Sequence, residues 1–316
     1  MQIDAENSEL RQISVDKVDR NPENPRVVFR PKELEELLES IRVYGVQVPI
    51  AVYKEGSRFV LIDGERRWKC CLKLNKKTIP ALVQEKPSPL TNLLLMFNIH
   101  ALREQWDYLT IALMLPRVTK LLTETLGREP SEAELSEKSG LTRGAIRRCK
   151  LLIDLPAQYQ QEILTDLNKP KSQQTLSEDL FIEMERALKT VERALPEVIS
   201  NKDIVRRVLI DKYKKNVITS IPQFRQIAKI ARAERVEADK GTAVRALCSL
   251  FKRNDYSITQ AYEESVSGAY SERDLLTRIS GLRDLMKTIG KADLDDQLRK
   301  ALHSLVKEVE KLLEEE

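Results

Sequence analysis

The spacing of apolar residues changes once along this chain, near residue 89, and this change constrains the fold more than any other feature. Before it, residues 48–53 and 58–62 are rich in β-branched and aromatic side chains and flank Glu55-Gly56-Ser57, which predicts a β-hairpin. After it, apolar residues recur at helical spacing almost to the C-terminus. The sequence therefore predicts a small α+β unit followed by an all-α remainder.

The composition agrees with this division and excludes several classes of protein. A chain of 316 residues is longer than one compact domain needs, so we expect two or three folding units. Only 10 glycines and 5% aromatic residues argue against a large β-sandwich or propeller. No apolar run approaches the ~20 residues of a membrane span, and the first ten residues lack the features of a signal peptide. We expect a cytoplasmic protein without membrane contact.

Cysteine and histidine are too few for most metal sites and for many catalytic sites. The four cysteines include an adjacent pair, Cys70 and Cys71, and none has the CxxC spacing of a zinc site, so we expect reduced thiols. The chain has only two histidines, which excludes sites built from several imidazoles. Ser-His-Asp chemistry is also excluded, unless His100 serves as its base.

Turn residues and charge suggest how the helical part is divided. The polar stretch 168–174 is the best candidate for a linker. Residues 201–260 hold 14 Lys and Arg against 6 Asp and Glu, a local excess of 8, which fits either a surface facing a polyanion or a solvated helical face. We expect four segments: 1–90, the α+β unit; 91–170, a helical domain; 171–265, a basic helical region; and 266–316, a C-terminal helical segment.

The last segment carries a seam of apolar residues at heptad spacing. The residues recur at intervals of four and three and are Leu298, Leu302, Leu305, Val309 and Leu312. Such a seam is typical of a helix that dimerises, but an ordinary helix packed on its own core shows the same pattern. Both interpretations stay open.

The segment LIDGERRWK, residues 61–69, has the features of a phosphate-binding turn. A strand ends at Asp63, Gly64 allows a tight turn, and a helix then begins whose first amides point outward with partial positive charge. Arg66 and Arg67 add two guanidinium groups suited to phosphate. The alternative is a surface helix with two solvated arginines.

Residues 127–156 have the features of a helix-turn-helix. Ser131 and Thr142 are suited to cap two helices, and Gly140 allows the sharp turn between them. The second helix would enter the major groove, with Arg143 near its N-terminus reaching base edges. The DNA-binding residues that we predict are Thr142, Arg143, Arg147, Arg148 and Lys150. The alternative is an ordinary helical hairpin.

Four motifs together resemble the ParB-type partition family. They are NPENPR at 21–26, the turn within SIRVYGVQVPI at 40–50, GERR at 64–67 and NIHALREQWDYL at 98–109, and the resemblance spans about residues 11–165. It implies a ParB-like domain that binds CTP and Mg²⁺, coupled to a helix-turn-helix that loads on a centromere-like DNA site. It also implies a nucleotide-gated clamp in chromosome or plasmid segregation, a homodimer, association with the nucleoid and a partition ATPase as partner.

The resemblance also assigns site residues. Gln47 matches a residue near the nucleotide, and Asn98 matches the residue that helps to hold the metal. Phe97 stands where the family has a glutamate, and it cannot bind Mg²⁺ or polarise water, so we expect weak or absent CTP hydrolysis. The residues that match the phosphate-binding motif are Gly64, Glu65, Arg66 and Arg67.

Two other functions remain open from the sequence. One is an enzyme on the same fold, a nuclease or phosphotransferase, with Glu65 as its base. The other is a transcription regulator whose nucleotide pocket has lost its ligand.

Overall fold

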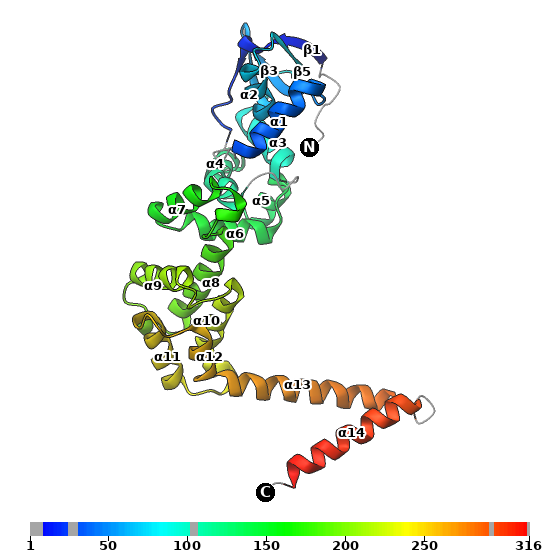
Figure 1. The fold of residues 1–316 in the computed structure, drawn as a ribbon, viewed down its shortest axis with the longest axis vertical. Coiled ribbons are helices and arrows are strands. Elements are labelled where there is room, and N and C mark those ends of the chain that lie inside the picture. The colour runs from blue at the N-terminus through cyan, green and yellow to red at the C-terminus, as the bar shows by residue number, and fades with distance from the viewer. Residues whose placement is uncertain (1–8, 25–30, 102–106, 291–293, 315–316) are drawn as a thin grey trace. The chain divides into compact units, whose positions relative to one another are not determined.

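The computed structural model describes residues 9–24, 31–101, 107–290 and 294–314. Its contacts divide the chain into two compact units, Met1–Arg186 and Ala187–Glu316 (Figure 1). The boundaries expected at residues 90, 170 and 265 stay predictions. In the described ranges, no helix combines the length and the apolar content that are needed to span a bilayer.

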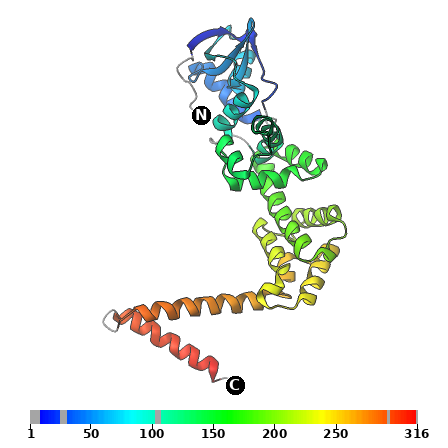
Figure 2. The same ribbon diagram turned by 180° about the vertical axis from the view of Figure 1, so that it is seen from behind.

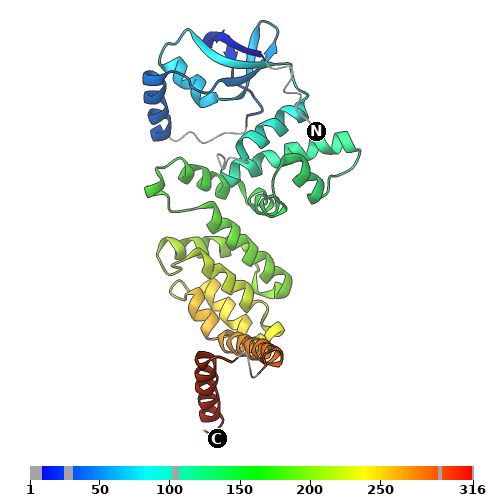
Figure 3. The same ribbon diagram turned by 90° about the vertical axis from the view of Figure 1, so that its right-hand side faces the viewer.

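A five-stranded mixed sheet forms the start of the first unit (Figure 3). Its order is β1-β5-β3-β4-β2, in which β3–β4 and β1–β5 are antiparallel while β3–β5 and β2–β4 are parallel. The predicted hairpin, β3 and β4, is confirmed, whereas β1 and β2 were not predicted. The strands are β1 Glu9–Ser14, β2 Val18–Asp19, β3 Ile50–Glu55, β4 Arg58–Asp63 and β5 Thr78–Gln84.

Two helices, α1 (Pro31–Tyr44) and α2 (Glu65–Lys73), pack on this sheet through their apolar faces. Both Cys70 and Cys71 are fully buried in the shared core, so they fill space as apolar side chains do. Burial raises the pKa of each thiol, which opposes formation of a reactive thiolate. Both are free thiols, as expected.

The remainder of the first unit is helical and contains the predicted helix-turn-helix. Ser131 and Glu134 form a reciprocal capping box, Gly140 has φ 74°, and Oγ1 of Thr142 accepts from the Ala145 amide at 3.1 Å. These local bonds confirm the predicted caps and the glycine turn. The helices are α3 Pro89–Ala101, α4 Tyr108–Leu126, α5 Glu132–Ser139, α6 Arg143–Ile153 and α7 Ala157–Leu167.

The polar stretch 168–174 is anchored rather than loose. The buried carboxylate of Asp166 accepts from the amides of Thr175 at 2.9 Å and Leu176 at 2.8 Å, and pairs with Lys169 at 2.8 Å. A short 3-10 turn, η3 (Lys171–Gln173), lies inside the stretch, and helix α8 (Glu178–Ala194) follows. The bend between α7 and α8 is therefore fixed at both ends by one side chain.

The second unit is a helical bundle from which two further helices continue (Figure 2). Leu209, Ile227, Leu247 and Ile258 belong to its core and are fully buried. The two last helices, α13 and α14, bury none of their residues in the described chain. The elements are η4 Pro196–Val198, α9 Lys202–Lys214, η5 Ile221–Gln223, α10 Phe224–Ile230, η6 Ala233–Val236, α11 Lys240–Lys252, α12 Ile258–Glu263, α13 Ser267–Thr288 and α14 Asp296–Leu313.

Candidate nucleotide and DNA sites

Gly64 forms the elbow between strand β4 and helix α2, and only glycine fits there. Its backbone has φ 94° and ψ 23°, in the left-handed region. A Cβ at this position would lie 2.6 Å from Cγ2 of Ile50. The elbow presents the first amides of α2, which have no acceptor within the helix and carry the positive end of its dipole. This arrangement suits an anion.

Arg67 holds the neighbouring loop in place. Its Nη1 donates to the carbonyls of Val48 and Pro49, both at 2.6 Å, and its Nη2 pairs with Asp63 at 2.7 Å. The side chain is only 17% exposed. Because its donors are engaged by the loop and by Asp63, Arg67 positions the loop against the elbow, and it is poorly placed to bind phosphate directly.

Arg66 turns in another direction, toward helix α1. Its Nη2 donates to the carbonyl of Glu33 at 2.8 Å, and its Nη1 lies 3.4 Å from the Glu33 carboxylate. The structure therefore gives the two guanidinium groups different partners instead of aiming both at one anion. Arg66 is more exposed than Arg67, at 27%, and its ion pair is longer. Of the two, Arg66 is the one that can change partner.

Glu65 is a structural carboxylate. It is 5% exposed and accepts from Nδ2 of Asn24 at 2.6 Å, while Nε of Arg20 lies at 3.1 Å and Nζ of Lys69 at 2.8 Å. Two cations thus compensate its charge beside the elbow, where an uncompensated carboxylate would repel phosphate. The same contacts leave it poorly placed as the base of an enzyme. Sequence reasoning missed Arg20 and Asn24, although Asn24 lies inside the NPENPR motif.

Two further residues, Gln47 and Asn98, are predicted nucleotide ligands. The structure describes the side chain of Gln47 but not that of Asn98. The amide of Gln47 is exposed and donates to the carbonyl of Tyr44 at the end of α1. Asn98 belongs to α3 by its backbone, but its side chain lies outside the described part of the chain, as do Pro25 and Arg26. Phe97, beside Asn98, is fully buried.

The side chains of the described residues do not form a metal site by themselves. These residues contain no cluster of three or more His, Cys, Asp or Glu side chains. The Mg²⁺ assigned to Asn98 therefore stays a prediction.

A second residue of the NPENPR motif connects the sheet domain to the helices. Asn21 is 1% exposed; its Oδ1 accepts from the Glu23 amide at 3.0 Å, and its Nδ2 donates to Oδ1 of Asn92 in α3 at 3.3 Å. Glu23 in turn pairs with Arg117 of α4 at 3.3 Å. The loop that holds Glu65 is thereby bonded to both α3 and α4. Sequence reasoning missed this connection.

Three of the predicted DNA-binding cations share one face of the recognition helix α6. Arg143, Arg147 and Lys150 stand at i, i+4 and i+7, and all three are exposed. Arg147 and Lys150 both contact Glu132 of α5, at 3.0 and 3.4 Å. Arg143, at the N-terminal end, makes no ion pair with any described residue. Thr142 is exposed and caps the helix, as expected.

Arg148 lies on another side of α6. Its guanidinium stacks 4.5 Å from the ring centre of Tyr108 and pairs with Asp179 of α8. These contacts attach the recognition helix to α4 and α8. The structure thus separates Arg148 from the other three cations, and its predicted contact with DNA is not supported by its position.

Glu178 caps helix α4 from the start of α8. Its carboxylate accepts from the amides of Tyr108 at 3.1 Å and Leu109 at 2.5 Å. Burial raises the pKa of Glu178 to about 7, although these two hydrogen bonds act in the opposite direction. Together with Arg148 and Asp179, Glu178 joins three helices at one point.

Known proteins resemble both the sheet domain and the helices. The model of the ParB N-terminal domain family matches residues 1–98. A probable chromosome-partitioning protein ParB of Pseudomonas putida is 31% identical over 213 residues, which cover 66% of this chain and 70% of that protein. This chain belongs to the ParB family. The expected ParB-like α+β domain followed by a helix-turn-helix and helical modules is confirmed.

Another relative is a nucleoid occlusion protein of a Geobacillus species, which is 27% identical over 206 residues, or 65% of this chain and 70% of that protein. Among solved structures, the C-terminally truncated ParB of Caulobacter crescentus complexed with CTP-gamma-S is 25% identical, with a TM-score of 0.29, and covers 56% of this chain and 92% of that chain. The same protein complexed to the centromeric parS site is 20% identical, with a TM-score of 0.43 and coverage of 70% and 98%.

Proposed function

We propose that this ParB-family chain is a CTP-gated DNA clamp that acts in the partition of a chromosome or plasmid. The observation that carries the proposal is the set of bonds that joins the Gly64 elbow to α4, the helix whose Tyr108 packs against Arg148 of α6. Glu65 is held by Arg20 and Asn24, and the same loop is bonded through Glu23 to Arg117 of α4. A ligand that moves the elbow therefore acts on the helices that carry α6.

In this proposal the phosphates of CTP bind at the first amides of α2, and the loop that Arg67 fixes contacts the rest of the nucleotide. Arg66 leaves Glu33 for a phosphate, because a charge-assisted bond to phosphate is stronger than its present 3.4 Å pair. Mg²⁺ would be held mainly by phosphate and water oxygens, with Asn98 as the protein ligand, which fits the reluctance of this ion to lose water. With Phe97 buried at the family's glutamate position, hydrolysis is slow.

DNA is bound by the exposed face of α6. Arg143, at its N-terminal end, reads base edges, whereas Arg147 and Lys150 contact bases or phosphates after exchanging Glu132 for DNA. Gating requires CTP to favour the closed clamp by a few kcal/mol over the open one. The partition ATPase implied by the resemblance remains a prediction.

The clamp needs two protomers, and the last two helices supply the apolar surface for a dimer. In α13, Leu275, Ile279, Leu282 and Met286 are exposed at heptad spacing, each between 38% and 59%. The predicted seam of α14 is likewise unburied within the described chain. Exposed apolar stripes of this kind are typical of helices that associate with a second copy.

Two measurements test the proposal. Calorimetry with CTP, ATP and GTP should show binding of CTP in the presence of Mg²⁺, and Arg66→Ala should weaken it at least tenfold. Arg42→Ala is the matched control, because Arg42 is also paired with a glutamate, Glu39, but lies on the exposed side of α1. Cross-linking of protomers on a closed DNA fragment should then increase with CTP.

Each alternative function has its own outcome. No binding of any nucleotide would leave a DNA-binding regulator without a ligand. Rapid metal-dependent cleavage of DNA would instead favour the enzyme.

A further inference from the structure

A cluster of cations and tyrosines in the second unit is not explained by the proposed clamp. We call it the Tyr–Arg corner. It is formed where the end of α10, turn η6, helix α12 and the start of α13 meet. Its members are Lys229, Arg232, Arg235, Tyr262, Tyr270 and Arg273.

The ammonium group of Lys229 lies between two aromatic rings. Its Nζ is 5.4 Å from the ring centre of Tyr262 and 5.1 Å from that of Tyr270, and the two ring centres are 6.1 Å apart. The Tyr270 hydroxyl also donates to the Lys229 carbonyl at 3.4 Å. Cation–π contacts of this kind hold a cation in one place without cancelling its charge. Lys229 therefore remains a positive group beside the two rings.

Three arginines follow Lys229 at this corner: Arg232 and Arg235 around turn η6, and Arg273 on α13. Arg273 donates through Nη1 to the Arg235 carbonyl, which fastens α13 to η6. Burial raises the pKa of Tyr270, while Arg232, Arg273 and Arg235 lower it, so all three act on the hydroxyl. With Lys229 at the rings, four positive charges come from α10, from the turn around η6 and from α13.

These four cations differ from several others in the second unit because they have no carboxylate partner. In the part of the chain that the structure describes, none of them forms an ion pair with a carboxylate. Nearby cations do: Lys240 pairs with Glu234 at 3.2 Å, and Arg253 pairs with Asp255 at 3.1 Å. Arg253 is a close comparison, since it also lies over a tyrosine ring, at 5.2 Å.

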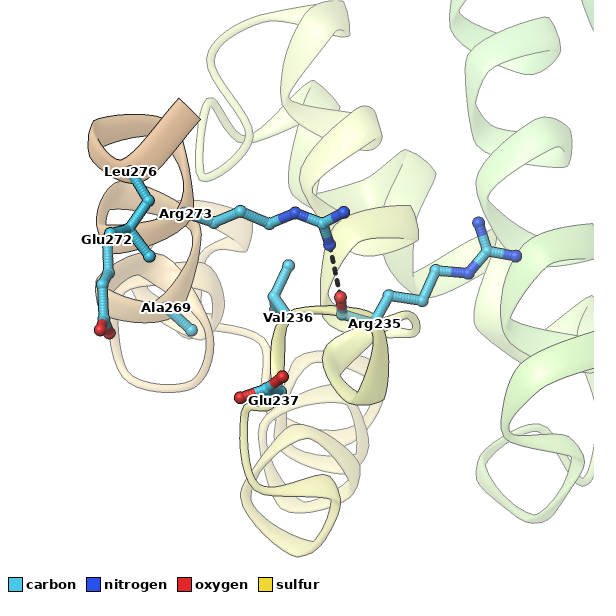
Figure 4. Close-up of a pocket in the computed structure, with 7 residues that line it drawn as sticks. All are labelled: Arg235, Val236, Glu237, Ala269, Glu272, Arg273 and Leu276. Atoms are coloured by element: carbon cyan, nitrogen blue, oxygen red, sulfur yellow. Dashed lines mark hydrogen bonds between the residues drawn. The ribbon is translucent and has the colours of Figure 1, made fainter. Parts of the chain in front are cut away.

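A hollow of about 460 Å³ opens beside the corner, between η6 and α13. Figure 4 shows the Arg273 side chain crossing it toward the Arg235 carbonyl. Glu237 and Glu272 also line the hollow; in this view the Glu272 carboxylate lies across the hollow from both guanidinium groups, and the Glu237 carboxylate lies below them. Neither carboxylate forms an ion pair with Arg235 or Arg273 in the described part of the chain.

We propose that the Tyr–Arg corner is a second DNA contact, which binds the phosphate backbone of duplex DNA without reading sequence; this proposal rests on the proposed DNA binding by α6. Positive charges that are held in place but not neutralised displace counterions from the phosphates that they contact. A row of phosphates suits cations drawn from several elements, and residues 201–260 carry an excess of 8 positive charges around them. Since the corner is tethered to the helix-turn-helix, its binding becomes intramolecular once α6 is bound.

The test compares two double variants of the full chain. Lys229→Gln with Arg235→Gln removes two uncompensated cations; Lys240→Gln with Arg253→Gln removes two cations that already have carboxylate partners. Binding to a duplex without a preferred site is measured between about 50 and 200 mM salt. Each lost phosphate contact lowers the slope of log K against log salt by ~0.9, so the first variant should lose ~1.8 and bind ~10–100-fold more weakly at 0.1 M salt. The control variant should keep the wild-type slope.

The outcomes distinguish the corner from the proposed clamp. Circular dichroism first establishes that both variants are folded. An unchanged slope in the Lys229/Arg235 variant overturns the proposal. It would still be overturned if the corner were then found to bind an acidic protein instead of DNA. Footprinting on the preferred site should show unchanged boundaries in both variants, because sequence is read by α6. A wild-type protein without any preferred site would refute the proposed clamp, while a slope difference between the variants would still support the corner.

Discussion

Replacing Gly64 by alanine tests whether the elbow is as tight as the structure shows. Two penalties add at this position. An L-residue at φ 94° is strained by ~1–2 kcal/mol. The new Cβ would also lie 2.6 Å from Cγ2 of Ile50 and 3.1 Å from its Cβ, where carbon atoms prefer about 3.5–4.0 Å. Overpacking of this kind costs ~1–3 kcal/mol, so the total is ~2–5 kcal/mol.

Gly56→Ala is the matched control for this substitution. Gly56 lies at the tip of the β3–β4 hairpin with φ 60°, and a Cβ there would meet nothing within 4 Å. It therefore bears the strain of the left-handed backbone alone, ~1–2 kcal/mol. The difference between the two variants isolates the collision with Ile50.

The free energy of unfolding of both variants is measured with denaturant and followed by tryptophan emission. Trp68 is a suitable probe because it lies on α2 directly after the elbow, and its Nε1 donates to the Val15 carbonyl at 3.2 Å. We expect Gly64→Ala to unfold at the lower denaturant concentration, with a free energy of unfolding ~1–3 kcal/mol below that of Gly56→Ala. CTP binding should be lost in the Gly64 variant only. Equal stability of the two variants would mean that Ile50 of β3 does not press on the elbow, which would refute the requirement for glycine at position 64.

Three further predictions concern single side chains. Arg147→Ala should weaken binding to the preferred DNA site by ~1–3 kcal/mol, whereas Arg148→Ala should lower the unfolding free energy and leave base preference intact; footprinting and denaturation distinguish them. The pKa of Glu178 is about 7 in the folded chain against the usual 4.5, so its contribution to stability is full below pH 4.5 and is lost as the pH rises through 7. Glu178→Gln should therefore flatten the dependence of the unfolding free energy on pH. Lys212, whose Nζ donates to the carbonyls of Leu250 and Tyr256, has a pKa lowered to about 8 by burial. Stability should therefore rise between pH 8 and 10.5, and Lys212→Met should abolish the rise and cost ~1–3 kcal/mol.

Local patterns predicted those elements whose cause lies within a few residues. The hairpin followed from β-branched residues on both sides of Gly56, and the caps of the recognition helix followed from Thr142 and the residues near it. Strand β1 has no alternation to read, since four of its six residues are exposed, and β2 has only two residues. Both strands exist because their partners in the sheet offer them unpaired backbone groups.

The turn beside the candidate nucleotide site was predicted, but the partners of its two arginines were not, and nucleotide binding there stays a prediction. The tight turn at Gly64 was predicted correctly because it depends on the conformation of that one residue. The role of Arg67 depends on the carbonyls of Val48 and Pro49, almost twenty residues away, and that of Arg66 depends on Glu33. A run of two arginines shows that positive charge is present. Only the folded chain shows which carbonyl or carboxylate lies near enough to accept a hydrogen bond from each guanidinium group.

Whether a cation is already compensated decides which basic residues of this chain are available to an anion. Arg67 and Arg148 belong to the motifs where the sequence predicts phosphate and DNA, yet each is engaged by a carboxylate and by a further group of the protein. Binding an anion there would first break those contacts, which costs nearly what the new contact would gain. Lys229 and Arg235 belong to no recognised motif, but they have no carboxylate to lose within the described chain. A polyanion is therefore favoured first at Arg143 of α6, which makes no ion pair with a described residue, and at the Tyr–Arg corner, while Arg67 holds the loop that a nucleotide would contact.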